Sequence, residues 1–217
     1  PAGLPAAKGA VRRMVSKSGS ANPLRELGSQ GQSVWLDYIR RDLIDTGELA
    51  RLVREDGVRG VTSNPSIFEK AVSGSGDYAA LIASAAREGR DAKAIYEQLA
   101  IRDIRDAADV LRPVHAGSQG RDGFVSLEVN PHLAHDTHGT IAEARRLWGR
   151  LDRPNVFIKV PATQEGLPAI RELTREGINV NVTLLFGLPR YKEVADAYLT
   201  GLEQRAAQGL PLEVSSV

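Results

Sequence analysis

Cysteine is absent from the 217-residue sequence, which excludes disulfide bonds, thiol nucleophiles and cysteine metal sites. The sequence also lacks an excess of either charge, because 28 Lys and Arg stand against 27 Asp and Glu. Binding to nucleic acid or to an anionic membrane depends on an excess of positive charge, so we expect neither as a partner. A cysteine-free chain suits a reducing compartment, and we expect a cytoplasmic location.

Long apolar runs are missing too. No stretch approaches the roughly 18 residues that indicate a membrane span, and the N-terminus has no apolar region of a secretory signal. Residues 1–21, PAGLPAAKGAVRRMVSKSGSA, are rich in small residues and contain no acid. This composition predicts a flexible tail. Its basic residues leave a transit peptide as the alternative.

From residue 33 onward, short β-branched segments alternate with longer amphipathic ones. This order predicts a parallel α/β sheet in one domain, 22–217. The expected strands are 33–39, 60–64, 124–129, 156–160, 178–184 and 212–217. The expected helices are 41–55, 78–88, 92–111, 140–151, 168–176 and 191–208, with Asp91 and Thr137 as plausible caps.

Six expected strands are fewer than the eight that close a (β/α)8 TIM barrel. The sixth, 212–217, coincides with the end of the sequence, where a barrel would have an unpaired edge. An open doubly wound sheet is one interpretation. We favour a barrel whose C-terminal part is missing from this chain.

Polar side chains lie near the C-terminal ends of the expected strands. Catalytic residues of α/β barrels gather at this end, and buried charges are costly unless they are paired or functional. The pattern therefore predicts a site built from Asp37, Asn64, Glu128, Lys159, Asn181 and Thr183.

Lys159 is the most specific of these residues. It lies among Phe157, Ile158 and Val160, and desolvation there would favour the neutral amine that attacks ketones. Asp37 and Glu128 would supply carboxylates for proton transfer. The alternatives are a lysine that extends into solvent and a structural ion pair between Lys159 and a carboxylate.

Other patterns are weaker. His132, His135 and His138 follow one another at three-residue steps, which rotate around a helix, and we expect no metal site. The SGSG segment at 73–76 lacks the Lys-Ser/Thr of a P-loop. No glycine-rich dinucleotide motif follows a strand.

Four segments in chain order, GVTSNPSIFEKA, SLEVNP, VFIKVPAT and GINVNVTLLF, resemble the signatures of transaldolases. The similarity extends from about Asn22 to the end and is strongest to bacterial transaldolases, including the transaldolase part of fusions with glucose-6-phosphate isomerase. It implies transfer of a dihydroxyacetone unit from sedoheptulose 7-phosphate to glyceraldehyde 3-phosphate in the pentose phosphate pathway, without a cofactor.

The resemblance implies a role for each catalytic candidate. Lys159 would form the Schiff base, and Asp37 would take and return the proton as the carbon–carbon bond breaks and forms. Glu128 would activate the water that makes and hydrolyses the imine, and Thr183 would hydrogen-bond that water.

Asn64 and Asn181 would bind hydroxyl groups of the dihydroxyacetone unit, and their amides can both donate and accept. Asn64 has the alternative of shaping a turn before Pro65. The family binds the substrate phosphate with a serine and arginines in and after the sixth strand, and the matching arginine would lie just beyond Val217. Three other functions stay as alternatives: a class I aldolase that releases dihydroxyacetone, an anion-binding module and an inactive assembly partner. The sequence also allows a homo-oligomer or a fused isomerase domain.

Overall fold

The computed structural model describes residues 22–217, so the expected tail, 1–21, lies outside the described residues. The strands are β1 (Val34–Leu36), β2 (Val58–Val61), β3 (Phe124–Glu128), β4 (Val156–Pro161) and β5 (Val180–Thr183). The helices are α1 (Pro23–Ser29), α2 (Arg41–Asp45), α3 (Glu48–Arg51), α4 (Pro65–Ser73), α5 (Ala79–Arg87), α6 (Ala92–Gly117), α7 (Thr137–Leu151), α8 (Gly166–Glu176) and α9 (Leu188–Ala207), with a π-helical turn η1 (Leu52–Asp56) and a 3₁₀ turn η2 (Pro131–Leu133).

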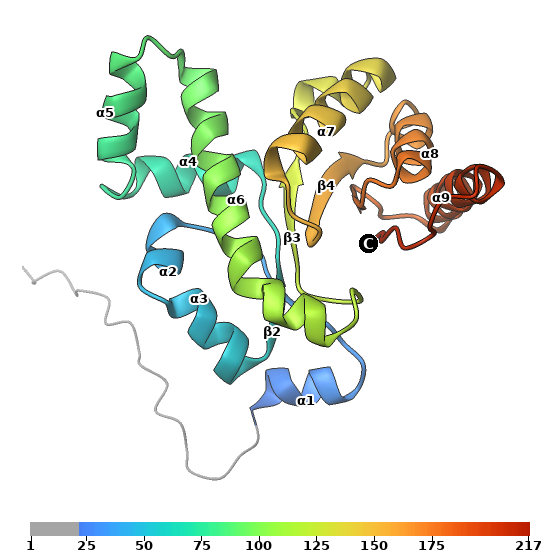
Figure 1. Ribbon diagram of the computed structural model, residues 1–217, viewed down its shortest axis with the longest axis horizontal. Helices are drawn as coiled ribbons and strands as arrows, with labels where there is room; N and C mark the ends of the chain where they lie inside the picture. The colour runs from blue at the N-terminus through green and yellow to red at the C-terminus, as the bar shows by residue number, and fades with distance from the viewer. Residues whose placement is uncertain (1–21) are drawn as a thin grey trace, which may run out of the picture.

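The five strands form one parallel sheet in the order β1-β2-β3-β4-β5. Each strand therefore pairs with the next one along the chain, as in a (β/α)8 barrel. Figure 1 shows α6, α7, α8 and α9 following one another around the sheet, with α4 and α5 at one end of α6. The described fold is half of an α/β barrel, which confirms the predicted fold class.

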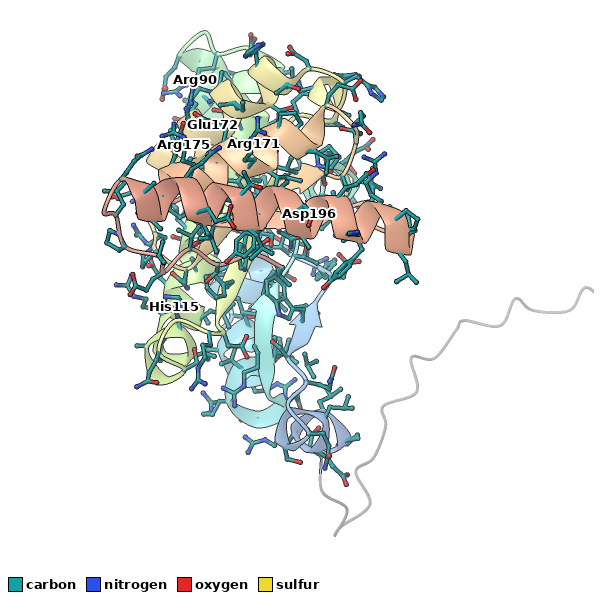
Figure 2. All side chains as sticks on the ribbon, turned by 90° about the vertical axis from the view of Figure 1, so that its right-hand side faces the viewer. Arg90, His115, Arg171, Glu172, Arg175 and Asp196 are labelled. Carbon is teal, nitrogen blue, oxygen red and sulfur yellow. The ribbon has the colours of Figure 1, made fainter. Side chains whose placement is uncertain are left out.

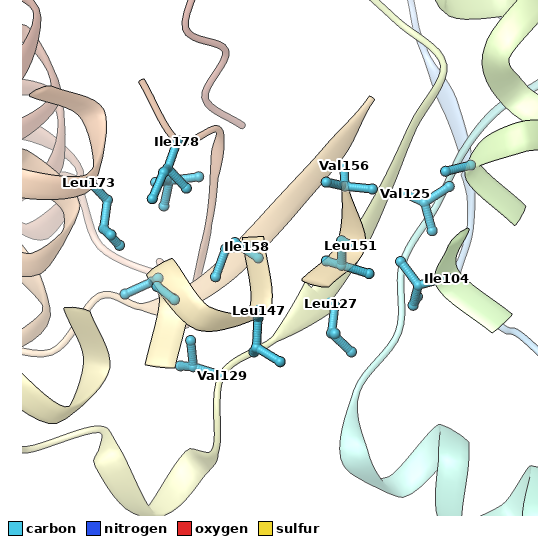
Figure 3. Packing of buried hydrophobic residues seen from close by; sticks show 14 of the residues in the cluster. Ile104, Val125, Leu127, Val129, Leu147, Leu151, Val156, Ile158, Leu173 and Ile178 are labelled. Carbon is cyan, nitrogen blue, oxygen red and sulfur yellow. The ribbon is translucent and has the colours of Figure 1, made fainter. Parts of the chain in front are cut away.

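The outer face of the sheet packs against the helices and forms the main core. Val156, Ile158 and Val160 alternate along β4 and are fully buried. They belong to one apolar cluster with Leu147 of α7 and Leu173 of α8, as Figure 3 shows for several of its members. Because side chains alternate across a strand, this burial directs Phe157 and Lys159 to the opposite, inner face.

The inner face begins with a layer of aromatic rings. The ring of Phe157 lies 4.3 Å from that of Phe124 and 6.1 Å from that of Trp35, measured between centroids. Trp35 is in register with Gly60 of β2, and a Cβ atom at Gly60 would overlap the indole. Glycine at this position therefore makes room for Trp35 between β1 and β2.

Helices α8 and α9 also approach each other closely, and Figure 2 shows α9 lying across α8. Gly201 of α9 is buried at the contact. A Cβ atom there would lie 2.6 Å from the Arg171 carbonyl oxygen and 2.8 Å from Thr174 Cβ. Across residues 22–217, no helix is both long enough and apolar enough to cross a membrane.

Most of the expected elements are present, with differences at their ends. The sixth expected strand pairs with β5 in parallel, by a single bridge between Val180 and Ser216. The expected helix 41–55 is divided into α2, α3 and η1, because Gly47 adopts a left-handed φ of 77°. Asp91 caps α6 as expected, whereas α7 is capped by Asp136 rather than by Thr137. Helices α1 and α4 were not predicted.

Candidate functional site

Glu128, Lys159 and Asn181 occupy paired positions on three neighbouring strands, β3, β4 and β5. The register places their side chains side by side on the inner face, at the C-terminal end of the sheet. Lys159 Nζ lies 3.5 Å from Glu128 Oε2, and the two side chains are only 14% and 15% exposed. The predicted amine and one of the predicted carboxylates are therefore in contact and largely shielded from water.

Ser63 and Ser126 form hydrogen bonds around this row of three residues. The Asn181 amide nitrogen donates to Ser126 Oγ at 2.9 Å. Ser63 Oγ donates to the Ser126 carbonyl oxygen at 2.7 Å, and Lys159 Nζ lies 3.5 Å from the Ser63 carbonyl oxygen. Both serines are fully buried, so they connect β2, β3 and β5 around Lys159.

Asn64 and Thr183 lie next to this row. The Asn64 side chain accepts a hydrogen bond from the Ile67 backbone at 2.9 Å and caps α4, which is the turn-shaping role considered as its alternative. Its amide nitrogen is a separate group and is not used in the cap. Thr183 is the last residue of β5 and is half-buried, two positions beyond Asn181 on the same face.

Asp37 follows directly after β1 and is exposed. It has the same parity as Trp35, which faces the interior, but no hydrogen bond or ion pair joins it to Lys159 within residues 22–217. The structure therefore brings Glu128, Lys159 and Asn181 together, and Asp37 lies at the C-terminal end of the first strand.

Glu128 also borders a cavity of about 290 Å³ between α6 and α7. The cavity wall includes Tyr96, Asn130 and His132 together with apolar residues of β3 and α7. Burial, and in second place the charge of Glu128, raises the pKa of Tyr96 to about 12. The Tyr96 hydroxyl therefore stays protonated beside the Glu128 carboxylate at neutral pH.

The contact between Lys159 and Glu128 is a mostly buried ion pair. Shielding two charges from water is costly, and mutual attraction repays this only partly, so the pair is weak evidence for stability. The separation of 3.5 Å exceeds the ~2.7–2.9 Å of a strong charge-assisted hydrogen bond. The two groups are therefore in ion-pair contact, at a distance longer than that of a strong hydrogen bond.

The histidines do not gather. His132 is part of η2, His138 lies in the first turn of α7, and His135 Nδ1 pairs with Glu165 at 3.1 Å. The described part of the chain contains no group of three side chains arranged to hold a metal ion.

Three contributors to the site were missed by the sequence interpretation. Ser63 acts partly through its backbone carbonyl, which no side-chain pattern reveals. Ser126 was placed on the same face as Glu128 but given no role, and Tyr96 lies on a helix more than 30 residues earlier in the chain than Glu128. The TSN and SLE triplets would have been the signals for the two serines.

Comparison with known proteins identifies the family of the chain. The family model described as Transaldolase/Fructose-6-phosphate aldolase matches residues 34–216. A transaldolase of Thiobacillus denitrificans is 53% identical over 191 residues, which are 88% of this chain and 53% of the relative. A transaldolase of Parafrankia sp. is 52% identical over 198 residues, 91% of this chain and 54% of the relative.

Transaldolase 1 of Streptomyces coelicolor is 51% identical over 199 residues, which are 92% of this chain and 52% of that protein. The chain thus spans about half the length of the curated relatives that it matches. The family match covers all five strands and the three residues in register at the C-terminal end of the sheet, Glu128, Lys159 and Asn181. The chain belongs to the transaldolase/fructose-6-phosphate aldolase family.

Proposed function

We propose that this chain carries the Schiff-base site of a transaldolase, which transfers a dihydroxyacetone unit from sedoheptulose 7-phosphate to glyceraldehyde 3-phosphate. The products are erythrose 4-phosphate and fructose 6-phosphate, and the reaction belongs to the pentose phosphate pathway. The contact that carries the proposal is the pairing of Lys159 Nζ with Glu128 Oε2 at 3.5 Å, both largely buried. The names of the relatives support the same activity.

The first half of the reaction forms an imine. The neutral amine of Lys159 attacks the ketose carbonyl carbon, and the carbinolamine then loses water to give a protonated imine. Glu128 holds the water that carries protons to and from these intermediates, and Thr183 hydrogen-bonds the same water. The Lys159 proton must leave before attack, and the nearby carboxylate provides a route for it.

The second half breaks and remakes a carbon–carbon bond. Asp37 takes the proton of the donor's C4 hydroxyl, the C3–C4 bond breaks, and its electron pair moves onto the imine to give an enamine. The aldehyde product leaves. The enamine then attacks the acceptor aldehyde, Asp37 returns the proton to the new hydroxyl, and water releases the ketose from Lys159. The imine itself accepts the electrons, so the scheme uses no cofactor.

Two amides bind the three-carbon unit in this scheme. Asn181 is held in place by Ser126 at 2.9 Å, and its oxygen is directed to a substrate hydroxyl. Asn64 caps α4 through its oxygen, so its amide nitrogen is the group that donates to substrate. Sugar phosphates are the proposed small-molecule partners, and the cytoplasm is the proposed location.

A second candidate is an aldolase that releases free dihydroxyacetone. The name of the matching family includes fructose-6-phosphate aldolase, and both activities use the same imine. The acceptor discriminates between them, because an aldolase turns over fructose 6-phosphate without an acceptor aldehyde. A transaldolase retains the three-carbon unit on Lys159 until an acceptor arrives.

Borohydride trapping tests the proposal directly. The full chain encoded by the gene is incubated with fructose 6-phosphate and reduced, and its intact mass and peptide map are recorded. We expect a stable adduct on Lys159 and none in Lys159→Ala. Lys70→Ala, a change at an exposed lysine of α4, serves as the control and should trap normally.

An adduct on another lysine, or equal trapping by Lys159→Ala, would reject Lys159 as the nucleophile. A folded wild-type chain without any adduct would reject Schiff-base chemistry.

A further inference from the structure

A second buried charged cluster lies near β1, away from Lys159. It consists of Arg41, Tyr78 and Asp103, which are 3%, 0% and 1% exposed. Arg41 NH1 donates to Asp103 Oδ1 at 2.9 Å, and the Tyr78 hydroxyl donates to Asp103 Oδ2 at 2.6 Å. The same hydroxyl accepts the backbone N–H of Arg41 at 2.9 Å. We call these three residues the Arg41 clamp.

The clamp joins three segments that are distant in sequence. Arg41 is the first residue of α2, Tyr78 caps α5, and Asp103 lies in α6. The first N–H groups of a helix have no partner within the helix, and here Tyr78 supplies one to α2. Burial raises the pKa of the Tyr78 hydroxyl, so it remains protonated and continues to donate to Asp103.

Two further carboxylates complete the surroundings of Arg41. Asp106 Oδ2 accepts from NH1 at 2.8 Å, and Asp45 Oδ1 accepts from Nε at 3.1 Å. Their side chains are 40% and 60% exposed, so they lie at the edge of the cluster. One guanidinium therefore binds three carboxylates, and this fixes the beginning of α2 in position and direction.

The clamp lies at one end of the short segment that carries Asp37. At the other end, the Leu36 carbonyl oxygen accepts the Thr62 N–H at 2.9 Å and attaches β1 to the sheet. Between them, Ile39 is fully buried in the core, whereas Asp37 is exposed. The backbone of the segment that carries Asp37 is thus anchored at both of its ends.

Such indirect positioning matters because proton transfer requires a short and directed contact. A displacement of ~1 Å at a reacting group can lower a rate ~100-fold, even when its cause is distant. Groups that work in this way need supporting contacts that fix their geometry. β1 has only three residues, so its own pairing gives Asp37 little support.

We propose that the Arg41 clamp is a positioning device for Asp37, holding its carboxylate where it can take the proton during carbon–carbon cleavage. This inference rests on the proposed function, because it assigns the clamp to one step of that reaction. Imine formation on Lys159 should not depend on the clamp, whereas cleavage of the bound ketose should.

Tyr78→Phe tests this in the full chain encoded by the gene, because it removes one hydroxyl and retains the buried ring. The chain is mixed with fructose 6-phosphate, reduced with borohydride, and the adduct on Lys159 is weighed. The wild type should hold mainly the three-carbon unit left after cleavage. Tyr78→Phe should trap as much ketose in total but hold mainly the uncleaved six-carbon phosphate, with turnover lowered ~10- to 100-fold.

Tyr198→Phe is the matched control. It removes a tyrosine hydroxyl that donates to the Val214 carbonyl oxygen at 2.6 Å, on α9 and outside the clamp. Its adduct should remain the three-carbon unit. Asp106→Asn, at a half-exposed edge of the clamp, is a milder second variant that should shift the adduct in the same direction if Tyr78→Phe does not fold.

The outcomes separate the two proposals. A wild type without any adduct would overturn the proposed function together with the clamp. A wild type that traps normally, with Tyr78→Phe and Asp106→Asn giving the same adduct ratio as Tyr198→Phe, would overturn the clamp alone. So would an equal loss of trapping and cleavage, which would mark the cluster as purely structural.

Discussion

Lys159 and Glu128 are register partners on adjacent parallel strands, with Nζ 3.5 Å from Oε2. Removing either charge would be costly, because the remaining charge would be buried without its partner. The same contact places a carboxylate next to the amine that would attack the ketose. The pair thus has a structural role and a proposed catalytic role, and mutations are needed to distinguish them.

Glu128→Gln should slow imine formation by about 100-fold or more, the usual contribution of a positioned acid or base. The amide keeps the shape of the side chain but transfers no proton. The rate at which fructose 6-phosphate becomes trappable on Lys159 measures this step. Glu143→Gln, at a carboxylate 3.6 Å from Arg146, is the control and should trap at the normal rate. If Glu128→Gln only lowers stability and leaves that rate unchanged, the pair is structural.

Asp37→Asn should leave imine formation intact and lower transfer by at least ~100-fold. Within residues 22–217, Asp37 forms no hydrogen bond or ion pair with Lys159 or Glu128, so the contact between these two residues is retained. The variant should therefore accumulate the uncleaved ketose on Lys159, which the mass of the reduced adduct reports. Asp109→Asn, which breaks an ion pair between α6 and Arg153 of the loop after α7, should behave as the wild type. A three-carbon adduct in Asp37→Asn would assign the proton to another group.

The row of Glu128, Lys159 and Asn181 could be predicted from sequence because strand parity is a local property. A polar residue within an apolar run, together with the residues two positions away, defines one face of a strand without knowledge of the fold. The division of 41–55 into three pieces was not predictable in the same way, since an amphipathic pattern continues across Gly47. The turn before Pro65, considered as the alternative role of Asn64, is the cap of α4.

The Arg41 clamp could not be predicted from the sequence, for a different reason. Tyr78 and Asp103 bind Arg41 across 37 and 62 residues, and no pattern within a segment records such a contact. In the sequence, Arg41 resembles the many charged residues of helix surfaces, which are usually solvated. Only the packing of α2 against α6 shows that it is buried.

Gly201→Ala should lower the free energy of unfolding, although alanine is the better helix former. The added Cβ would lie 2.6 Å from the Arg171 carbonyl oxygen, so α9 must move away from α8, at a typical overpacking cost of ~1–3 kcal/mol. Gly149→Ala in α7 is the matched control, because a Cβ there meets nothing within 4 Å. It should stabilise by up to ~1 kcal/mol. Urea unfolding of both variants gives the comparison, and equal stabilisation would show that α8 and α9 tolerate separation.

The ion pairs of Glu172 should make part of the free energy of unfolding depend on pH. Its carboxylate is held by Arg175 at 2.6 and 3.0 Å and by Arg145 of α7 at 3.4 Å, and Figure 2 shows Glu172 beside Arg175 on α8. The hydrogen bonds from Arg175 lower the pKa of Glu172 to about 2. The pKa of Glu172 is lower in the folded protein than the unfolded value of ~4.3. Its ionised carboxylate therefore contributes its full stabilisation of the fold at pH values above ~4.3. This stabilisation is lost as pH falls toward 2.

Glu172→Gln should therefore be less stable than the wild type by ~0.5–1 kcal/mol near neutral pH, as expected for a partly exposed network. The difference should shrink steadily as the pH falls from about 4.5 to about 2, and it should be smaller at high salt because exposed charges are screened. Glu203→Gln, at an exposed position of α9, is the control and should follow the wild type throughout. Urea unfolding over this pH range measures the effect, and a difference that is constant with pH would mean that Glu172 stabilises α7 and α8 through packing rather than through its charge.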